Sequence, residues 1–224
     1  MSGAGHDEGF LPLHRSEALT DGIFAVAMTL LVIELKLPDN GALRSADELA
    51  GALGALIPKA ISWALSFFVL ALFWIGHHRA FAHVRSTDGR LVVLNLLQLA
   101  CVSLMPFSSA LSGEYGRALL SQVVFSINMA LLGVTALLVL RYIHAHPELG
   151  PKPMSTAKYR SARLRVAGVI VISIVALVIA VWAPVPAFGN IAFMLMAVIS
   201  PLSRAIERRE LDSARRAEVV ARSP

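Results

Sequence analysis

The chain has 224 residues, of which 56% are hydrophobic and 16% charged, and its formal net charge at pH 7 is +5. In a soluble domain about a quarter of all residues are charged. No single compact core could bury apolar runs as long as those found here. The composition therefore excludes an ordinary soluble protein and indicates an all-α integral membrane protein. Because the basic residues flank apolar runs, the membrane surface explains the positive charge, and we expect no nucleic acid partner.

Six segments are apolar enough to be transmembrane helices, since a hydrocarbon core of about 30 Å requires about 20 helical residues. Pro106 lies inside the third segment and is predicted to kink it. Pro184 and Pro186 separate the last two segments and predict a tight reversal there. The predicted helices cover residues 19–37, 53–76, 91–111, 118–140, 166–183 and 188–203.

The segments belong to one domain, because no internal repeat of the six-helix unit is present. We expect a cytoplasmic N-terminal segment at residues 1–18, a six-helix transmembrane domain at 19–203 and a basic cytoplasmic tail at 204–224. The N-terminal segment lacks the basic stretch and short apolar stretch of a signal peptide, so we expect the first helix to remain in the mature protein.

The distribution of lysine and arginine predicts the orientation. Only four of the 20 basic residues, Lys36, Arg44, Lys59 and Arg117, fall on one side of the predicted membrane. Cytoplasmic loops are enriched in such residues, so we expect both termini in the cytoplasm of a multi-pass protein of the inner (plasma) membrane. An even number of spans agrees with this pattern.

Polar residues at the cytoplasmic end of the first two helices need partners, because ionisable groups within a membrane are costly. Asp21 follows Arg15 and Thr20 near the start of the first helix, and Trp74 and His77 lie at the same depth in the second. Trp74 offers an indole N–H and His77 an imidazole. Two interpretations remain open: one buried polar network, or separate residues solvated at the interface.

Other polar residues in the spans have simpler interpretations. Glu34 and Lys59 lie near the outer ends of the first two helices, where each can reach water or headgroups or pair with the other. Four amides inside the third and fourth helices are expected to hydrogen-bond across helices: Asn95, Gln98, Gln122 and Asn128.

The sequence lacks the motifs of common enzyme classes and the TVGYG-type carbonyl filter of many potassium channels. We therefore expect neither an enzyme nor a bound cofactor. His77, His78 and His83 could suggest a metal site, but adjacent histidines point to different faces of a helix, and we expect no metal there.

The stretch Arg15-Ser-Glu-Ala-Leu-Thr-Asp21 resembles the signature Arg-x-x-x-Phe-Ser-Asp of the transmembrane protein 175 family of potassium channels. Leu19 and Thr20 replace the phenylalanine and serine of that signature and keep its apolar and hydroxyl character. The second helix ends in Trp74-x-x-His77-x-x-x-Phe81, and the third carries Asn95 and then Ser-Leu-Met-Pro-Phe, both similar to the family.

The resemblance implies a fold and a set of site residues. Bacterial members have one six-helix unit per chain and form homotetramers, in which the first helix of each subunit lines a central pore. Counting from Asp21 assigns Val26, Leu30 and Ile33 to an apolar constriction and Thr29 to a ring of hydroxyls beside it. By the same resemblance, Arg15, Thr20, Asp21, Trp74 and His77 form a structural network that holds the first helix against the second.

We therefore expect a cation channel that conducts potassium, modestly in preference to sodium, through a hydrophobic constriction without a carbonyl filter. Its partners would be potassium ions, the lipid bilayer and further copies of the chain. A secondary transporter of a small solute or proton is the main alternative, and a membrane protein with a purely structural role is another.

Overall fold

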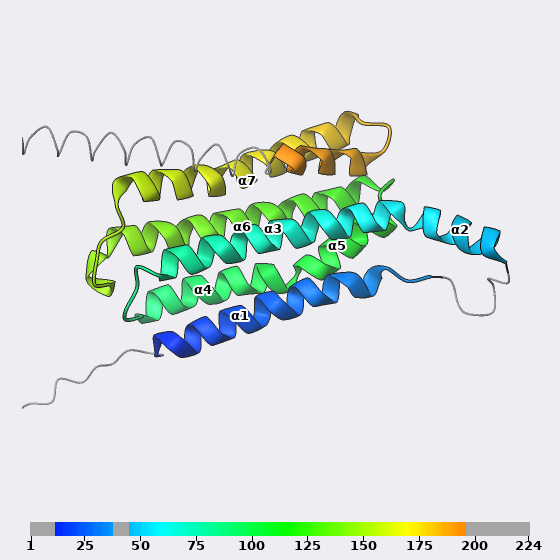
Figure 1. Cartoon of the computed structure of the whole chain (residues 1–224). Helices are drawn as coiled ribbons and strands as arrows, with labels where there is room; N and C mark the ends of the chain where they lie inside the picture. The colour runs from blue at the N-terminus through cyan, green and yellow to red at the C-terminus, as the bar shows by residue number, and fades with distance from the viewer. Residues whose placement is uncertain (1–11, 38–44, 196–224) are drawn as a thin grey trace, which may run out of the picture.

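The computed structural model describes residues 12–37 and 45–195, which are helical apart from short connections (Figure 1). The α-helices are α1 (Leu13–Leu30), α2 (Ala46–Ala55), α3 (Ile57–Phe81), α4 (Gly89–Ser103), α5 (Met105–Glu114), α6 (Leu119–Ala145) and α7 (Thr156–Trp182). Three 3₁₀-helices are η1 (Leu31–Glu34), η2 (Pro147–Leu149) and η3 (Pro186–Leu195). No β-strand occurs in these two ranges, so the prediction of an all-α protein is confirmed.

Five helical stretches within the described ranges are long and apolar enough to cross a membrane. They are Leu13–Glu34, Ile57–Phe81, Gly89–Glu114, Leu119–Ala145 and Thr156–Trp182. They correspond in order to the first five predicted transmembrane helices. Of the predicted sixth helix, residues 188–195 belong to η3, whereas residues 196–203 lie outside the described part of the chain.

The first two spans have different limits from those predicted. Helix α1 begins at Leu13 rather than at residue 19 and so enters the predicted N-terminal segment 1–18. Its first turn contains polar residues, which a hydropathy criterion leaves out although they continue the helix beyond the hydrocarbon. The turn predicted at 38–41 and the tail at 204–224 both lie outside the described residues.

The predicted second helix, 53–76, joins parts of two helices. The separate helix α2 begins with a capping box, in which Ser45 Oγ accepts from the Glu48 amide at 3.1 Å and Glu48 Oε2 accepts from the Ser45 amide at 3.0 Å. Pro58 lies in the first turn of α3, where its missing N–H leaves no intrahelical bond unmade. The prolines and capping residues therefore place the start of the second span at Ile57.

The third span is broken where its proline predicts a kink. Helix α4 ends at Ser103 and α5 begins at Met105, with Pro106 in the first turn of α5. Proline cannot donate a backbone hydrogen bond and its ring clashes with the preceding turn, so the break falls just before it.

Successive spans run in alternating directions, and α1 lies along one edge of the bundle (Figure 1). Helix α1 packs against α3, α4 and α5, whereas α7 packs against α6 and η3. Five helix ends lie together on the left of Figure 1: the start of α1, the end of α3, the start of α4, the end of α6 and the start of α7. We call this the basic end, because it carries Arg15, Arg79, Arg90, Arg141 and Lys158.

Two apolar clusters hold the helices together. The larger one includes Phe24, Leu70 and Leu99, each at most 1% exposed, and joins α1, α3 and α4 to the other spans. The smaller one lies toward the basic end and includes Phe81 and Leu91. The edge helix α1 is thus anchored on one side, and within the described part of the chain its other side is exposed.

Two connections at the basic end are joined by backbone contacts. The carbonyl of Leu149 accepts from the amides of Arg85 at 2.6 Å and Ser86 at 3.1 Å. Gly150, the next residue, lies directly against the carbonyl group of His83. The connection between α3 and α4 is therefore fixed to the connection between α6 and α7.

Candidate pore-lining helix

Helix α1 has one face buried against the rest of the chain. The spacing of the buried positions, every three or four residues, places them on one side of the helix. These buried residues are Ser16, Thr20, Phe24, Ala27 and Leu31. Polar side chains occupy the face near the basic end and apolar side chains the remainder, so two kinds of interaction hold α1 in place.

The four residues predicted to line a pore lie away from this buried face. Val26, Leu30 and Ile33 are 56%, 42% and 51% exposed, and Thr29 is exposed beside them. Contiguous exposed side chains as apolar as these are typical of a surface that contacts lipid or another protein.

The exposed face of α1 changes its helical pitch near its end. Ile33 belongs to η1, in which the chain makes about 3.0 residues per turn instead of 3.6. Leu30 is the last residue of α1 and Ile33 follows three residues later, a spacing that keeps both near one face of the helix. The hydroxyl of Thr29 donates to the Val26 carbonyl at 2.8 Å, which directs its proton to the backbone and leaves its oxygen lone pairs available as an acceptor.

A hydrogen bond joins the basic-end halves of α1 and α3. The indole Nε1 of Trp74 donates to Asp21 Oδ1 at 2.8 Å. Both residues are exposed on the surface of the single chain, and Trp74 also stacks on His78. The contact satisfies a carboxylate placed near the membrane boundary and connects α1 to α3.

A second, buried group of hydrogen bonds joins α1, α3 and α4. Asn95 Oδ1 lies 2.9 Å from His77 Nε2, and since an amide oxygen can only accept, His77 carries a proton on Nε2. The amide nitrogen of Asn95 donates to Thr20 Oγ1 at 3.0 Å and to Ser16 Oγ at 3.2 Å. Thr20 in turn donates to the Ser16 carbonyl at 2.9 Å. Asn95 is therefore the centre of this group.

The structure divides the residues expected to form one network. Asp21 and Trp74 form one pair, Thr20 and His77 meet only through Asn95, and Arg15 has an exposed side chain that makes no hydrogen bond among those found in the described ranges. Sequence reasoning assigned Asn95 only a general bonding role across helices and did not single out Ser16. The signal that could have identified Asn95 was its position as an amide inside the apolar third segment, which also carries the family pattern.

At the other end of the molecule, Lys59 forms an ion pair with Glu114 of α5. The sequence left open whether Lys59 would reach the interface alone or pair with Glu34. Glu34 lines the same small pocket as Lys59 and Glu114, but the ion pair is with Glu114. Of the alternatives that the sequence left open, the pairing of Lys59 with Glu34 is not the one observed; Lys59 pairs instead with Glu114 of α5, against which α3 packs.

Within residues 12–37 and 45–195, no group of three or more histidine, cysteine, aspartate or glutamate side chains could hold a metal ion. His77 bonds to Asn95, and the ring Nδ1 of His83 lies 3.1 Å from the Arg79 carbonyl. These two histidines have separate hydrogen-bond partners and do not converge.

Known proteins resemble this chain in sequence and in fold. Residues 15–106 match the family described as "Endosomal/lysosomal potassium channel TMEM175". A protein of Streptomyces collinus named as a potassium channel is 40% identical over 106 residues, covering 46% of this chain and 48% of that protein. A mouse protein named "Endosomal/lysosomal proton channel TMEM175" is 32% identical over 112 residues, covering 48% of this chain and 22% of that protein.

Solved structures resemble the fold over most of the chain. A lysosomal potassium-selective channel TMEM175 homolog from Chamaesiphon minutus superposes with a TM-score of 0.71 at 24% identity, covering 85% of this chain and 97% of that one. A variant of the potassium channel MtTMEM175 superposes with a TM-score of 0.52 at 16% identity, covering 96% of this chain and 100% of that one.

The sequence matches have a limited extent. The chain spans about half the length of the bacterial relatives that it matches. The family model matches residues 15–106, the part in which α1, α3 and α4 form the hydrogen bonds described above. Over residues 15–106 the chain is similar to the TMEM175 family, and the relatives that it matches include bacterial proteins named as potassium channels.

Proposed function

We propose that the chain forms a potassium-conducting channel in which α1 lines the ion pathway. The observation that carries the proposal is the division of α1 into a face anchored on the bundle and an opposite, exposed face with Val26, Thr29 and Leu30. Bacterial relatives named as potassium channels support the choice of ion.

A single α1 cannot enclose an ion path, so the proposal requires several copies of the chain around one axis. Closed rotational symmetry is the usual arrangement of such assemblies, and the proposal is a homotetramer. Helix α1 lies at the edge of its own bundle (Figure 1), where it can become the central helix of an assembly. The positive-inside rule then places the basic end and both termini in the cytoplasm of the inner membrane.

The chemistry of the exposed face suggests how conduction is controlled. Rings of Val26, Leu30 and Ile33 would form an apolar constriction that closes by losing water, because a narrow apolar passage does not retain it. The hydroxyl oxygens of Thr29, directed to the same side, could replace part of the hydration shell of a potassium ion. Selectivity for potassium over sodium would then be modest, since no carbonyl filter is needed in this arrangement.

The proposal is tested by potassium flux from liposomes that contain the purified protein. Val26→Ser and Leu30→Ser should raise the flux several-fold or change the ratio of potassium to sodium flux, because a hydroxyl retains water in an apolar constriction. Val178→Ser is a matched control, since Val178 on α7 is 55% exposed compared with 56% for Val26. If the native protein is silent and both α1 variants behave like Val178→Ser, α1 does not line an ion pathway.

A proton channel is a second candidate, because the mouse relative carries that name. The same liposomes distinguish the two ions when a pH indicator is enclosed. Potassium flux that persists when a pH gradient is absent supports the first candidate. Acidification that depends on a pH gradient, without potassium flux, supports the second.

A further inference from the structure

A cavity of about 80 Å³ lies between α3, α6 and α7 in the half of the molecule near the basic end. Its walls are mainly apolar and include Leu72 and Gly76 of α3, Val139 of α6 and Val166 of α7, and Gln98 of α4 also lines it. One water molecule needs about 10–15 Å³ of such free volume, so the cavity accommodates a larger apolar group.

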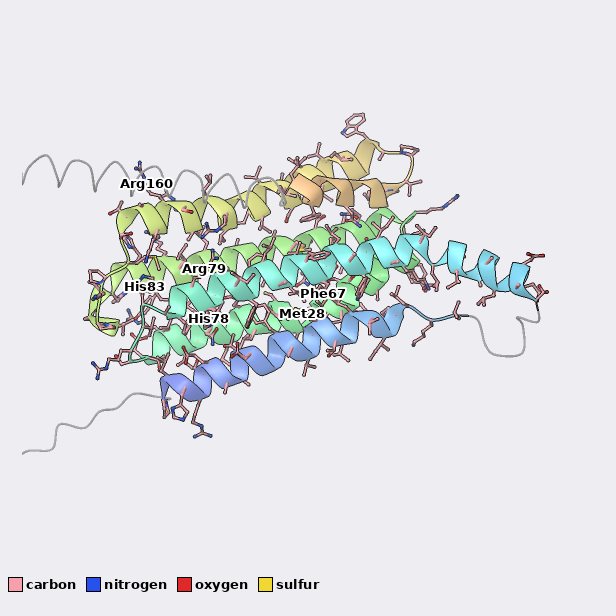
Figure 2. The ribbon with its side chains drawn as sticks, in the orientation of Figure 1. Met28, Phe67, His78, Arg79, His83 and Arg160 are labelled. Carbon is pink, nitrogen blue, oxygen red and sulfur yellow. The ribbon has the colours of Figure 1, made fainter. Side chains whose placement is uncertain are left out.

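Two arginines line the same cavity. Arg79 is exposed near the end of α3, where Figure 2 shows it at the same end of the molecule as His78, His83 and Arg160. Arg165 of α7 is partly buried and donates from Nη1 to Ser161 Oγ at 2.7 Å. Among the described residues that line the cavity, none is acidic.

The sequence of α7 places the guanidinium group of Arg165 at the level of lipid headgroups, and Arg79 of α3 lines the same cavity. The helix begins with the basic stretch Lys158 to Arg165, and from Val166 to Trp182 it carries no charged residue and is mainly apolar. Such a change marks the boundary between headgroups and hydrocarbon. The cavity therefore has a positive rim at headgroup depth and apolar walls at acyl-chain depth.

We propose that this cavity binds one anionic phospholipid, with an acyl chain between α3 and α7 and the phosphate held by Arg79 and Arg165. Charge complementarity favours this occupant over a second copy of the chain, because the basic end of a neighbouring copy, in the same orientation in the membrane, would bring further positive charge to the rim. Bidentate contacts suit arginine to phosphate. The site is separate from the exposed face of α1 and goes beyond the proposed channel function.

The test measures phospholipid binding to the intact protein in detergent by native mass spectrometry. The probes are phosphatidylglycerol and phosphatidylcholine with identical acyl chains. The double variant Arg79→Gln/Arg165→Gln removes the positive rim and should weaken phosphatidylglycerol binding roughly twenty-five-fold, given about five-fold for each basic residue near a lipid surface. Arg160→Gln is the matched control, since it removes a charge from α7 outside the cavity lining.

A second variant fills the cavity and is not expected to destabilise the fold. A Cβ atom added at Gly76 would meet nothing within 4 Å, so Gly76→Leu should enter the cavity and weaken binding of both phospholipids. Gly51→Leu in α2 is its control, because Gly51 has the same free space and lies far from the cavity along the chain.

The proposal predicts that the native protein prefers phosphatidylglycerol, that the double variant loses this preference, and that both controls retain it. Equal binding of the two phospholipids by the native protein would overturn it. So would an equal loss in Arg160→Gln, which would indicate a diffuse surface attraction, or unchanged binding in Gly76→Leu. A change in oligomer mass in Gly76→Leu with no loss of lipid would show that another copy of the chain covers the cavity.

Discussion

Asn95 joins three helices through the side chains of Ser16, Thr20 and His77. Asn95 is buried, and both the oxygen and the nitrogen of its amide group form hydrogen bonds. Hydrogen bonds within membranes average about 0.6 kcal/mol each, but a buried donor left without a partner costs about 1–3 kcal/mol. The arrangement thus depends more on Asn95 than on any one of its partners.

Replacing Asn95 with leucine, which has a similar volume, should lower the free energy of unfolding by about 1–3 kcal/mol, because His77 and the two hydroxyl groups lose their partner. Gln122→Leu is a suitable control: it removes one hydrogen bond, to Ser126 at 3.1 Å, together with a buried amide oxygen that has no partner among the described residues. Its effect should be close to zero. Unfolding by sodium dodecyl sulfate in mixed micelles measures both, and equal losses would contradict the central role of Asn95.

Asp88 caps the start of α4, where its Oδ1 accepts from the Leu91 amide at 2.8 Å. Burial raises the pKa of its carboxyl group, but hydrogen bonds from Tyr142 and the Leu91 amide, with the positive charges of His146 and Arg90, outweigh this and lower the pKa below its ordinary value. A carboxyl group with a lowered pKa in the folded state stabilises the fold above its unfolded pKa of about 3.9. This contribution is lost as the pH falls through the folded pKa.

Asp88→Asn should therefore reduce stability at pH 7 by less than about 1 kcal/mol, because asparagine still caps the helix and water screens the lost charge. The difference between native and variant should narrow as the pH falls below about 4. Unfolding of both proteins at a series of pH values from 3 to 7 measures it. A difference that stays constant over this range would mean that the charge of Asp88 contributes nothing.

At the scale of elements, the sequence predicted some features of α1 and missed others for physical reasons. The depth of Asp21 and Trp74 followed from counting residues along apolar helices, so their proximity could be foreseen. The links from Thr20 to His77 through Asn95 could not, because an amide in a span can rotate toward several neighbours and only the packing of α4 selects one. The ion-pair partner of Lys59 was equally hard to predict, since the position of Glu114 depends on the break at Pro106.

The connections at the basic end behave as one element because Gly150 allows their backbones to meet. A methyl group at Gly150 would overlap the carbonyl oxygen of His83, so Gly150→Ala must separate the two connections and weaken the bonds from Arg85 and Ser86 to Leu149. We expect a loss of about 1–3 kcal/mol or more in the free energy of unfolding.

Hydrogen exchange at the amides of Arg85 and Ser86 gives a local measurement, and it should become faster in Gly150→Ala. Gly51→Ala serves as the control, because an added Cβ there meets nothing within 4 Å and alanine favours a helix. Unchanged exchange and unchanged stability in Gly150→Ala would show that the two connections are not joined through this contact.

At the scale of the whole molecule, composition and hydropathy were sufficient to predict an all-α membrane protein and the order of its first five spans. The ends of these spans were harder to predict from the sequence. Helices continue through polar turns, as α1 does at Leu13, and they are interrupted by prolines within apolar sequence. From the sequence, only the family resemblance could suggest that residues on the exposed face of α1 line a pore. Valine, leucine and isoleucine at helical spacing pack equally well against lipid, against other helices or around a pore.

The most direct test of α1 as the pore helix uses the single cysteine of the chain, Cys101, which is replaced by serine. Val26→Cys and Val178→Cys are then introduced separately, at positions that are 56% and 55% exposed in one chain. Potassium flux from liposomes is measured before and after a positively charged methanethiosulfonate reagent is added. We predict that modification of Val26→Cys blocks the flux and that Val178→Cys is unaffected, whereas full labelling of Val26→Cys without any change in flux would contradict a pore lined by α1.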